Sequence, residues 1–397
     1  MMSVVGVCHF FSHFYQLALP PLFVLIHQVE GHSYASLALL VTVMYSVSFA
    51  LQLPVGFFVD RYGARPILMA GVALFAAATM LYGLIPGYPA LVVLSVVAGA
   101  ANSVFHPADY SILNASVTKL RLGRAFSIHN FGGFMGYAAA PILMSGMGAL
   151  WGWKTAVLVA GAAGLMTVVA AVALSGDFRD SSHTRRDQNS RSDLKTDLRL
   201  LFSAPALICV VFFALLSAGQ MGPQWFGDKI YYLAHNIPVV IGNSYISMFV
   251  VGIMAGVIIG GFAADKARDH LKLAFGSFFL SGVGMFLMAI VPPSPEIIYP
   301  LFVVTGFLFG FGFSSRDMVV SSLAPPESSG KVFGFVFSGL DIGAAAGPIV
   351  YGYLIGSGRH LEAFYVSALL IGLAGVSVFA AGKSALARTA RSDQAGA

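Results

Sequence analysis

The run Gly123-Arg124-Ala125-Phe126 returns 207 positions later as Gly330-Lys331-Val332-Phe333, which indicates that the chain contains an internal repeat. A second run, Gly56-Phe57-Phe58-Val59-Asp60-Arg61, returns as Gly261-Phe262-Ala263-Ala264-Asp265-Lys266 at nearly the same spacing. Each copy lies among long apolar segments, and a polar stretch separates the copies. Two similar apolar halves joined by a hydrophilic linker are typical of a secondary transporter whose substrate path lies between the halves.

The composition is that of a membrane protein. Of the 397 residues, 57% are hydrophobic and only 10% are charged, whereas an average soluble domain has about 25% charged residues. Because apolar runs of about 20 residues can cross a bilayer as helices, we predict an all-α membrane protein. It has twelve transmembrane helices in two pseudo-symmetric six-helix bundles. The predicted spans are residues 4–28, 36–59, 66–85, 89–112, 125–146, 153–174, 201–226, 241–264, 271–291, 297–323, 330–354 and 361–382.

These spans divide the chain into four parts. The predicted parts are an N-terminal bundle at residues 1–175, a cytoplasmic linker at 176–200, a C-terminal bundle at 201–383 and a cytoplasmic tail at 384–397. With both termini inside, the cytoplasmic segments hold 18 of the 22 Lys and Arg residues; the exceptions are Lys154, Lys229, Arg316 and Arg359. Cytoplasmic loops carry such an excess of basic residues. We therefore expect a multi-pass protein of the cell inner membrane with both termini in the cytoplasm.

Several functional classes are disfavoured by the sequence. It has no Gly-x-x-x-x-Gly-Lys-Ser/Thr run, which argues against direct drive by ATP. Cys8 and Cys209 lie inside predicted spans and indicate neither a disulfide framework nor a metal site. The net charge of +5 follows from topology, so no nucleic-acid partner is needed to explain it. We expect a monomer that is not an enzyme and has no metal or other cofactor.

The first apolar run lacks a cleavage signature and preceding basic residues, so we expect a retained helix, and the true start could lie upstream of Met1.

The loop after the second predicted span is the most specific motif in the chain. It reads Gly56-x-x-x-Asp60-Arg61-x-Gly63-x-Arg65 and resembles the signature loop of the major facilitator superfamily. Gly56 permits close helix approach, and Gly63 permits a tight turn. The alternative is a structural turn with flanking charges, which the twelve spans and the second copy disfavour. The resemblance implies a gate at the cytoplasmic face formed by Gly56, Asp60, Arg61, Gly63 and Arg65, and in the repeats by Arg124, Asp265, Lys266 and Lys331.

A second stretch of sequence resembles one particular branch of this superfamily. Ser103-Val104-Phe105-His106-Pro107, followed by Gly123-Arg124-Ala125-x-Ser127-Ile128-His129, is similar to the fosmidomycin-resistance branch of that superfamily, as is Ser12-His13. Members of this branch export drugs or other small molecules, and the similarity covers most of the N-terminal half. The resemblance therefore implies export of a small molecule by alternating access, and it places spans 1, 4, 7 and 10 around a central cavity.

Ionisable residues within the spans mark the expected path of substrate and protons. A charge at the centre of a membrane helix costs roughly 2.5–3.5 kcal/mol on insertion scales, so such residues usually have a function. His106 and Asp109 share one face of span 4, and Asp109 is the repeat mate of Arg316. We predict that these two charges lie on opposite walls of one cavity. The predicted path residues are His13, His106, Asp109, Arg316, Asp317 and Asp341.

Structural interpretations of the same residues stay open. His106 precedes a proline, so it could serve only to hydrogen-bond freed backbone groups. His9 and His129 are interpreted as structural. Asp109 and Arg316 could form a static pair that helps folding. Asp341 could be a neutral, hydrogen-bonded acid, but a mid-span carboxylate that changes its protonation state is also what a proton carrier requires.

Two contacts are predicted at the cytoplasmic face. Asp60 and Asp265 end spans 2 and 8, and Lys331 and Arg124 begin spans 11 and 5. The resemblance implies that span 2 packs on span 11 and that span 8 packs on span 5. Because a helix N-terminus favours a carboxylate, we expect Asp60 to approach Lys331 and Asp265 to approach Arg124.

The predicted function is proton-coupled export of a small molecule across the inner membrane, with protons and the lipid bilayer as the other partners. One alternative within transport is proton-coupled uptake of a small organic anion, attracted by Arg316 and the histidines. The alternative from another class is a non-transporting membrane receptor on a transporter scaffold.

Overall fold

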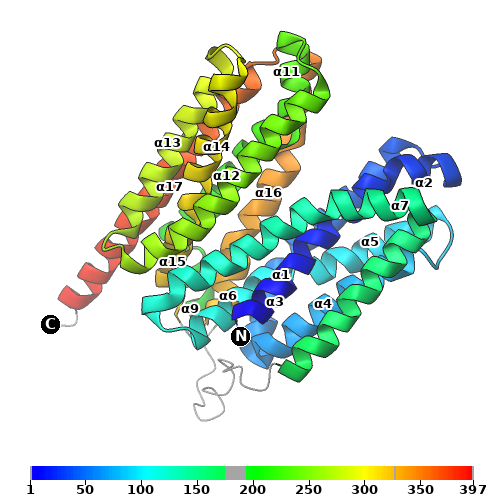
Figure 1. Cartoon of the computed structure of the whole chain (residues 1–397). Helices are drawn as coiled ribbons and strands as arrows, with labels where there is room; N and C mark the ends of the chain where they lie inside the picture. The colour runs from blue at the N-terminus through cyan, green and yellow to red at the C-terminus, as the bar shows by residue number, and fades with distance from the viewer. Residues whose placement is uncertain (1, 175–193, 326–327, 396–397) are drawn as a thin grey trace. The chain divides into compact units, whose positions relative to one another are not determined.

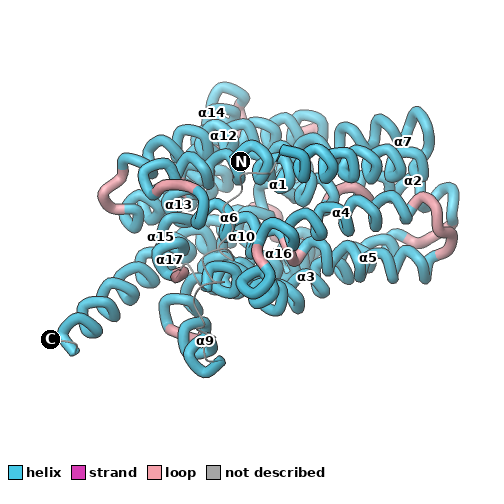
Figure 2. Tube along the Cα trace, turned by 90° about the horizontal axis from the view of Figure 1, so that it is seen from below, coloured by secondary structure: helices cyan, strands magenta, loops and turns pink. Residues whose placement is uncertain are grey.

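The computed structural model describes residues 2–174, 194–325 and 328–395, and within these ranges the regular structure is entirely helical. Figure 2 shows helices joined by loops at their ends. Most of the predicted linker, residues 176–193, and the last two residues of the predicted tail lie outside the described ranges. The described end of the linker belongs to α9 (Leu194–Leu201).

The N-terminal part of the chain contains the first six predicted crossings (Figure 1). Its elements are α1 (Met2–Gln16), η1 (Pro20–Leu22), α2 (Phe23–Glu30), α3 (Tyr34–Tyr62), α4 (Ala64–Tyr82), α5 (Tyr88–Asn102), α6 (Phe105–Ser116), η2 (Lys119–Arg121) and α7 (Leu122–Leu174). The 53-residue α7 consists of two helices, because Gly152 has a left-handed φ of 82° and breaks the helical path. Figure 1 shows the chain reversing its direction within α7.

The C-terminal part supplies the remaining crossings. Its elements are α10 (Ala204–Trp225), α11 (Gly227–His235), α12 (Val239–Lys266), α13 (His270–Ile290), α14 (Pro295–Phe311), α15 (Phe313–Leu323), α16 (Ser329–Gly356) and α17 (Glu362–Ala395). Eleven segments of the described residues are long and apolar enough to span a membrane. One of them, Lys119–Ala173, contains both helices of α7, so the described chain accommodates the twelve predicted spans.

Three of the predicted spans are interrupted within the described residues, although continuous helices were predicted. Span 1 is divided between α1 and α2, whereas α10 ends at Trp225, one residue before the predicted end of span 7. Span 4 breaks between α5 and α6, and span 10 breaks at Gly312 between α14 and α15. Proline and glycine explain the breaks, because Pro107 lies just inside α6 and Gly312 separates α14 from α15. Interrupted helices in transporters commonly lie at binding sites.

The chain forms two compact units. Unit 1 contains residues 1–117, 128–190 and 326–334, and unit 2 contains residues 118–127, 191–325 and 335–397. Each unit therefore includes a short segment that begins a helix of the other half of the sequence. The beginning of α7 belongs to unit 2, and the beginning of α16 belongs to unit 1.

Glycine stripes explain how the helices pack within each unit. A Cβ added at Gly132 or Gly136 of α7 would collide with the backbone of α1. In unit 2, Gly252, Gly256 and Gly260 of α12 meet the backbone of α14 in the same way. These stripes of small residues bring helix backbones together in a lipid environment, where the hydrophobic effect does not join helices.

Candidate functional site

The candidate site begins with two histidines on α1. His9 and His13 are one helical turn apart, so they share a face. This face packs against α7, where a Cβ at Gly133 would lie 2.9 Å from Cδ2 of His9 and 3.0 Å from Cδ2 of His13. The glycine therefore lets both imidazole rings lie against the backbone of α7. His9 is buried, whereas His13 is partly exposed.

Asp109 of α6 is at the centre of the site. Its side chain has no exposed surface, and its Oδ2 lies 3.1 Å from Nδ1 of His9 and 3.1 Å from Nε2 of His129. An ionised carboxylate can only accept hydrogen bonds, so with Asp109 ionised each of these ring nitrogens donates a proton. The rings of His9 and His129 stack with their centroids 3.6 Å apart. Three residues from α1, α6 and α7 are thus joined in one buried cluster.

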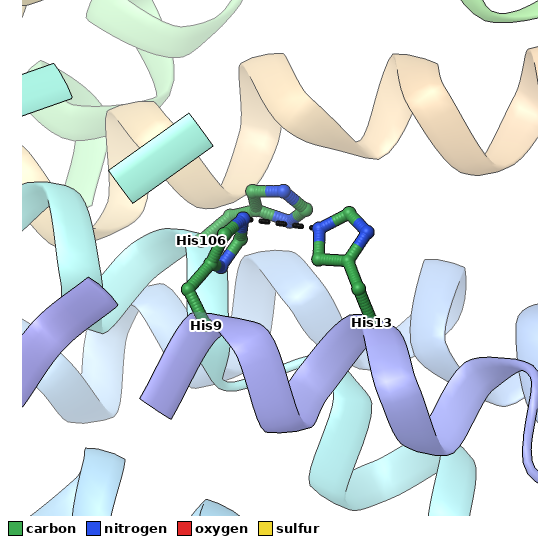
Figure 3. Close-up of side chains that lie close together, drawn as sticks. All are labelled: His9, His13 and His106. Carbon is green, nitrogen blue, oxygen red and sulfur yellow. Dashed lines mark hydrogen bonds between the residues drawn. The ribbon is translucent and has the colours of Figure 1, made fainter. Parts of the chain in front are cut away.

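Two further histidines extend the cluster toward a less buried region. Nε2 of His13 lies 3.0 Å from Nε2 of His9, and the ring of His106 lies 5.6 Å from that of His9 (Figure 3). His106 is partly exposed, like His13. We define the histidine cluster as His9, His13, His106, Asp109 and His129. All five residues belong to unit 1.

A neutral hydrogen-bond network adjoins the histidine cluster. The ring of Tyr137 contacts that of His13 at 4.2 Å, and its hydroxyl donates to Gln16. Gln16 donates to Asn102 at 2.8 Å, and Asn102 donates to Ser48 at 2.9 Å. No local sequence pattern predicts this network, because its members come from four different helices. It gives unit 1 a continuous polar interior from α6 to α3.

In unit 2, the predicted path residues Arg316 and Asp317 pair locally. Nε of Arg316 lies 3.1 Å from Oδ1 of Asp317, and both side chains are almost completely buried. The guanidinium group also lies over the ring of Phe313, 3.8 Å from its centroid, and 5.0 Å from the ring centroid of Phe213. Asp341 is buried on α16, with 7% of its surface exposed. Because Asp109 and Arg316 belong to different units, their predicted pairing across a cavity stays a prediction.

The signature loop forms a carboxylate cap on another helix. Oδ1 of Asp60 accepts a hydrogen bond of 2.7 Å from the backbone N–H of Gly330, and Oδ2 accepts one of 3.2 Å from that of Lys331. Both donors lie in the first turn of α16, and the contact lies within unit 1. A Cβ at Gly56 would lie only 2.6 Å from the carbonyl oxygen of Gly330, so glycine is needed for this approach.

The second copy forms the matching contact within unit 2. Oδ1 of Asp265 accepts from the backbone N–H of Arg124 at 3.3 Å, and the Arg124 guanidinium pairs with the same carboxylate. Both predicted approaches are therefore present, although Asp60 meets the backbone of Lys331. Their role in gating stays a prediction. Gly63 has φ 98° at the junction of α3 and α4, as a tight turn requires. Arg61 and Lys266 are exposed, and Arg65 is partly exposed.

An apolar cavity of about 370 Å³ lies apart from these charges. It is in unit 2 between α10 and α16 and is lined by residues such as Val211, Ala214 and Gly343. No charged side chain lines it. The ionisable groups therefore make the histidine cluster and the Arg316–Asp317 pair the stronger candidates for a transport site.

Comparison with known proteins identifies the family to which this chain belongs. The family model of the major facilitator superfamily matches residues 5–244 and 230–395, so the chain belongs to this superfamily of transporters. The fosmidomycin resistance protein of Escherichia coli is 22% identical over 87% of this chain and 84% of its own length. The probable sulfoacetate transporter SauU of Cupriavidus necator is 24% identical over 94% and 91% of the two chains.

A solved structure shows the same fold. The fucose:proton symporter FucP of Escherichia coli superposes with a TM-score of 0.75 over 96% of this chain and 97% of its own, at 12% sequence identity. These findings confirm the predicted all-α fold and the resemblance to the fosmidomycin-resistance branch. Members of this superfamily are multi-pass membrane transporters and are generally not enzymes.

Proposed function

We propose that the protein exports a small molecule across the inner membrane by alternating access, coupled to protons. The observation that carries this proposal is the burial of Asp109, whose Oδ2 is shared by the ring nitrogens of His9 and His129. A carboxylate and several histidines in contact can exchange protons near neutral pH, where free histidine titrates. Intramembrane groups of this kind form proton relays in transporters.

The position of the histidine cluster suggests how a proton would change the conformation of the transporter. His9 and His13 lie on the first half of span 1, and His106 and Asp109 lie directly after the break in span 4. A proton added to the cluster changes the hydrogen bonds that join α1, α6 and α7. If the two conformations hold this proton with different affinity, pH shifts the balance between them. We also propose that protonation of Asp341, a buried acid in unit 2, contributes to the conformational change.

The carboxylate caps supply the gate in this proposal. Asp60 holds the first turn of α16, and Asp265 holds the first turn of α7. Each of these helices continues into the other unit. Breaking the caps would free both helices to move, so we propose that the caps close the cytoplasmic side. The basic residues around them support cytoplasmic termini.

The names of the relatives support two directions of transport. A relative named for resistance to fosmidomycin supports export. A relative named as a probable sulfoacetate transporter supports the alternative, proton-coupled uptake of a small organic anion, for which Arg316 supplies a buried positive charge. A receptor on the same scaffold would bind its ligand without net flux.

A binding screen followed by a flux measurement tests the proposal. Purified protein is screened by thermal shift against drugs and metabolites, beginning with fosmidomycin and sulfoacetate. Compounds that bind are then followed in oriented vesicles with and without a pH gradient. We expect proton-driven movement in the export direction, strongly reduced by Asp109→Asn and unchanged by Glu296→Gln, which replaces an exposed acid at the start of α14. Accumulation in the uptake direction would favour the organic-anion alternative, and binding without flux would favour a receptor.

A further inference from the structure

We propose that His9, His13 and His106 bind one divalent transition-metal ion, such as Zn²⁺ or Co²⁺, and that Asp109 orients His9 for this role. The proposal concerns a binding site and does not depend on the direction of transport or on proton coupling. It arises from side chains that the fold brings together, and the sequence pattern alone did not indicate it.

The donor atoms of the three histidines lie close enough together to share one metal ion. One ligand atom from each of the three histidines lies within 4.8 Å of the others. Nε2 of His9 and Nε2 of His13 are 3.0 Å apart. Two imidazole nitrogens that share a tetrahedral Zn²⁺, each at about 2.0–2.1 Å, lie about 3.3 Å apart. A shift of a few tenths of an ångström at this pair, with rotation of the His106 ring, would complete a three-nitrogen site.

A hydrogen bond to Asp109 orients the ring of His9 for metal binding. A metal-binding histidine almost always donates its other ring N–H to a carboxylate or carbonyl, which fixes the tautomer and the orientation of the ring. Nδ1 of His9 lies 3.1 Å from Oδ2 of Asp109, so the unprotonated Nε2 faces His13. Asp109 is itself held by His129. The carboxylate would also offset part of the charge of the ion.

The chemistry of the donors selects the kind of ion. Three neutral imidazole nitrogens suit zinc, cobalt, nickel and copper, whereas magnesium and calcium prefer oxygen ligands. A three-histidine site also leaves a position open for water or another ligand. His13 and His106 are partly exposed, which gives the ion a route to the site.

A second set of donors, His9, Asp109 and His129, satisfies the same distance criterion. All three of its members are buried. Using Asp109 as a ligand would also remove the hydrogen bond that orients His9. We therefore assign the ion to the partly exposed set, and the variants below distinguish the two.

The test is a Co²⁺ titration of the full chain in detergent, purified without a histidine tag. Co²⁺ bound by histidine nitrogens gives visible absorption bands, and equilibrium dialysis gives the stoichiometry. We expect about one ion per chain, displaced by Zn²⁺. His13→Gln and His106→Gln should each weaken binding more than 10-fold. Asp109→Asn should weaken binding roughly 10- to 100-fold, the range known for outer-shell partners, while the band positions persist because the ligands are unchanged.

Two controls make the result decisive. His235→Gln removes an exposed histidine of α11, and His129→Gln removes a member of the second set but keeps a donor for Asp109. His235→Gln should leave the affinity within about 3-fold of the wild type, whereas His129→Gln should weaken binding less than His13→Gln or His106→Gln does, because His129 contacts Asp109 but is not a ligand. Size-exclusion profiles show whether each variant folds, and the partly exposed position of His13 makes His13→Gln informative even if Asp109→Asn does not fold. No stoichiometric binding, or binding lost in His129→Gln but kept in His13→Gln and His106→Gln, would overturn the assignment.

Discussion

Removing the charge of Asp60 should open the cytoplasmic side of the transporter. Asp60 accepts hydrogen bonds from the first turn of α16 at 2.7 and 3.2 Å, and its side chain is buried there. Asparagine keeps one carbonyl oxygen that can accept from the first turn of α16, so Asp60→Asn removes the negative charge and one of the two hydrogen bonds. A carboxylate near a partly buried helix N-terminus contributes up to about 2 kcal/mol, and a hydrogen bond contributes about 0.5–1.5 kcal/mol. For Asp60→Asn we therefore expect about 1–2 kcal/mol of lost stabilisation in the capped conformation. This corresponds to a shift of roughly 5- to 30-fold in the conformational equilibrium.

Distance measurements between spin labels would report this shift. Tyr62 ends α3 in unit 1, and Leu120 lies in η2 of unit 2; both are exposed. Labels at Tyr62→Cys and Leu120→Cys, in a chain without the buried Cys8 and Cys209, should show a larger population of long distances in Asp60→Asn. An unchanged distance distribution in a folded Asp60→Asn protein would refute the gating role of the cap.

Asp269→Asn is the matched control for this experiment. Oδ1 of Asp269 accepts from the backbone N–H of Lys272 at 3.0 Å and so caps α13, but this contact is exposed and joins neighbouring residues. The bonds from Lys272 lower the pKa of Asp269 below its ordinary value of 3.8. Whatever this carboxylate contributes to stability is therefore present above pH 3.8 and is lost only as the pH falls through the lower, folded-state pKa. At neutral pH the control tests loss of a charged cap without loss of the α16 contact, and it should leave the distances unchanged.

The remaining predictions concern packing, coupling, the buried pair and topology. Gly123→Ala should lower the thermal stability of the purified protein, because its Cβ would lie 2.8 Å from Oδ1 of Asp265; Gly276→Ala, with open space around it, should be neutral or stabilising by about 0.4–1 kcal/mol. Asp341→Asn should abolish pH-driven flux and leave counterflow exchange largely intact, and wild-type pH dependence in this variant would contradict its assigned role. Arg316→Ala should impair transport and cost about 3–5 kcal/mol of stability, because it removes the guanidinium group that pairs with the buried carboxylate of Asp317; a double-mutant cycle with Asp109→Ala that shows no coupling energy would contradict the predicted pairing of Asp109 with Arg316. Reporter fusions at Ala397 should show a cytoplasmic C-terminus, and an external reporter would reverse the assigned topology.

The crossings were predictable from the sequence because length and hydropathy determine which segments can enter a bilayer. Every predicted span coincides with a helical segment to within a few residues. The interruptions were not predicted, although signals for them were present. Pro20-Pro21 lies at the break in span 1, Pro107 follows the break in span 4, and Gly312 lies at the break in span 10. Mean hydropathy is an average over many residues, so it does not change where a helix is interrupted at apolar residues.

The site was only partly predictable for a different reason. The two carboxylate caps were predicted from two sources. Each copy of the repeat places an acid at the end of one helix and a base at the start of another, and the resemblance to the major facilitator superfamily implied which helices pack together. His9 and His129 were interpreted as structural, yet both contact Asp109. The four-residue spacing of His9 and His13 was a signal that these rings share a face. No local signal places His129 against Asp109, because that contact depends on how α1, α6 and α7 pack together.

Proton movement accompanying transport is the most direct test of the central claim. The purified protein is placed in proteoliposomes that contain a pH-sensitive dye, and a compound identified by the thermal-shift screen is added without any imposed pH gradient. A proton-coupled exporter should move protons opposite to the compound, with a fixed ratio of the two fluxes, and Asp341→Asn should abolish the proton signal. Net movement of the compound with no proton movement in the wild-type protein would contradict the proposed coupling.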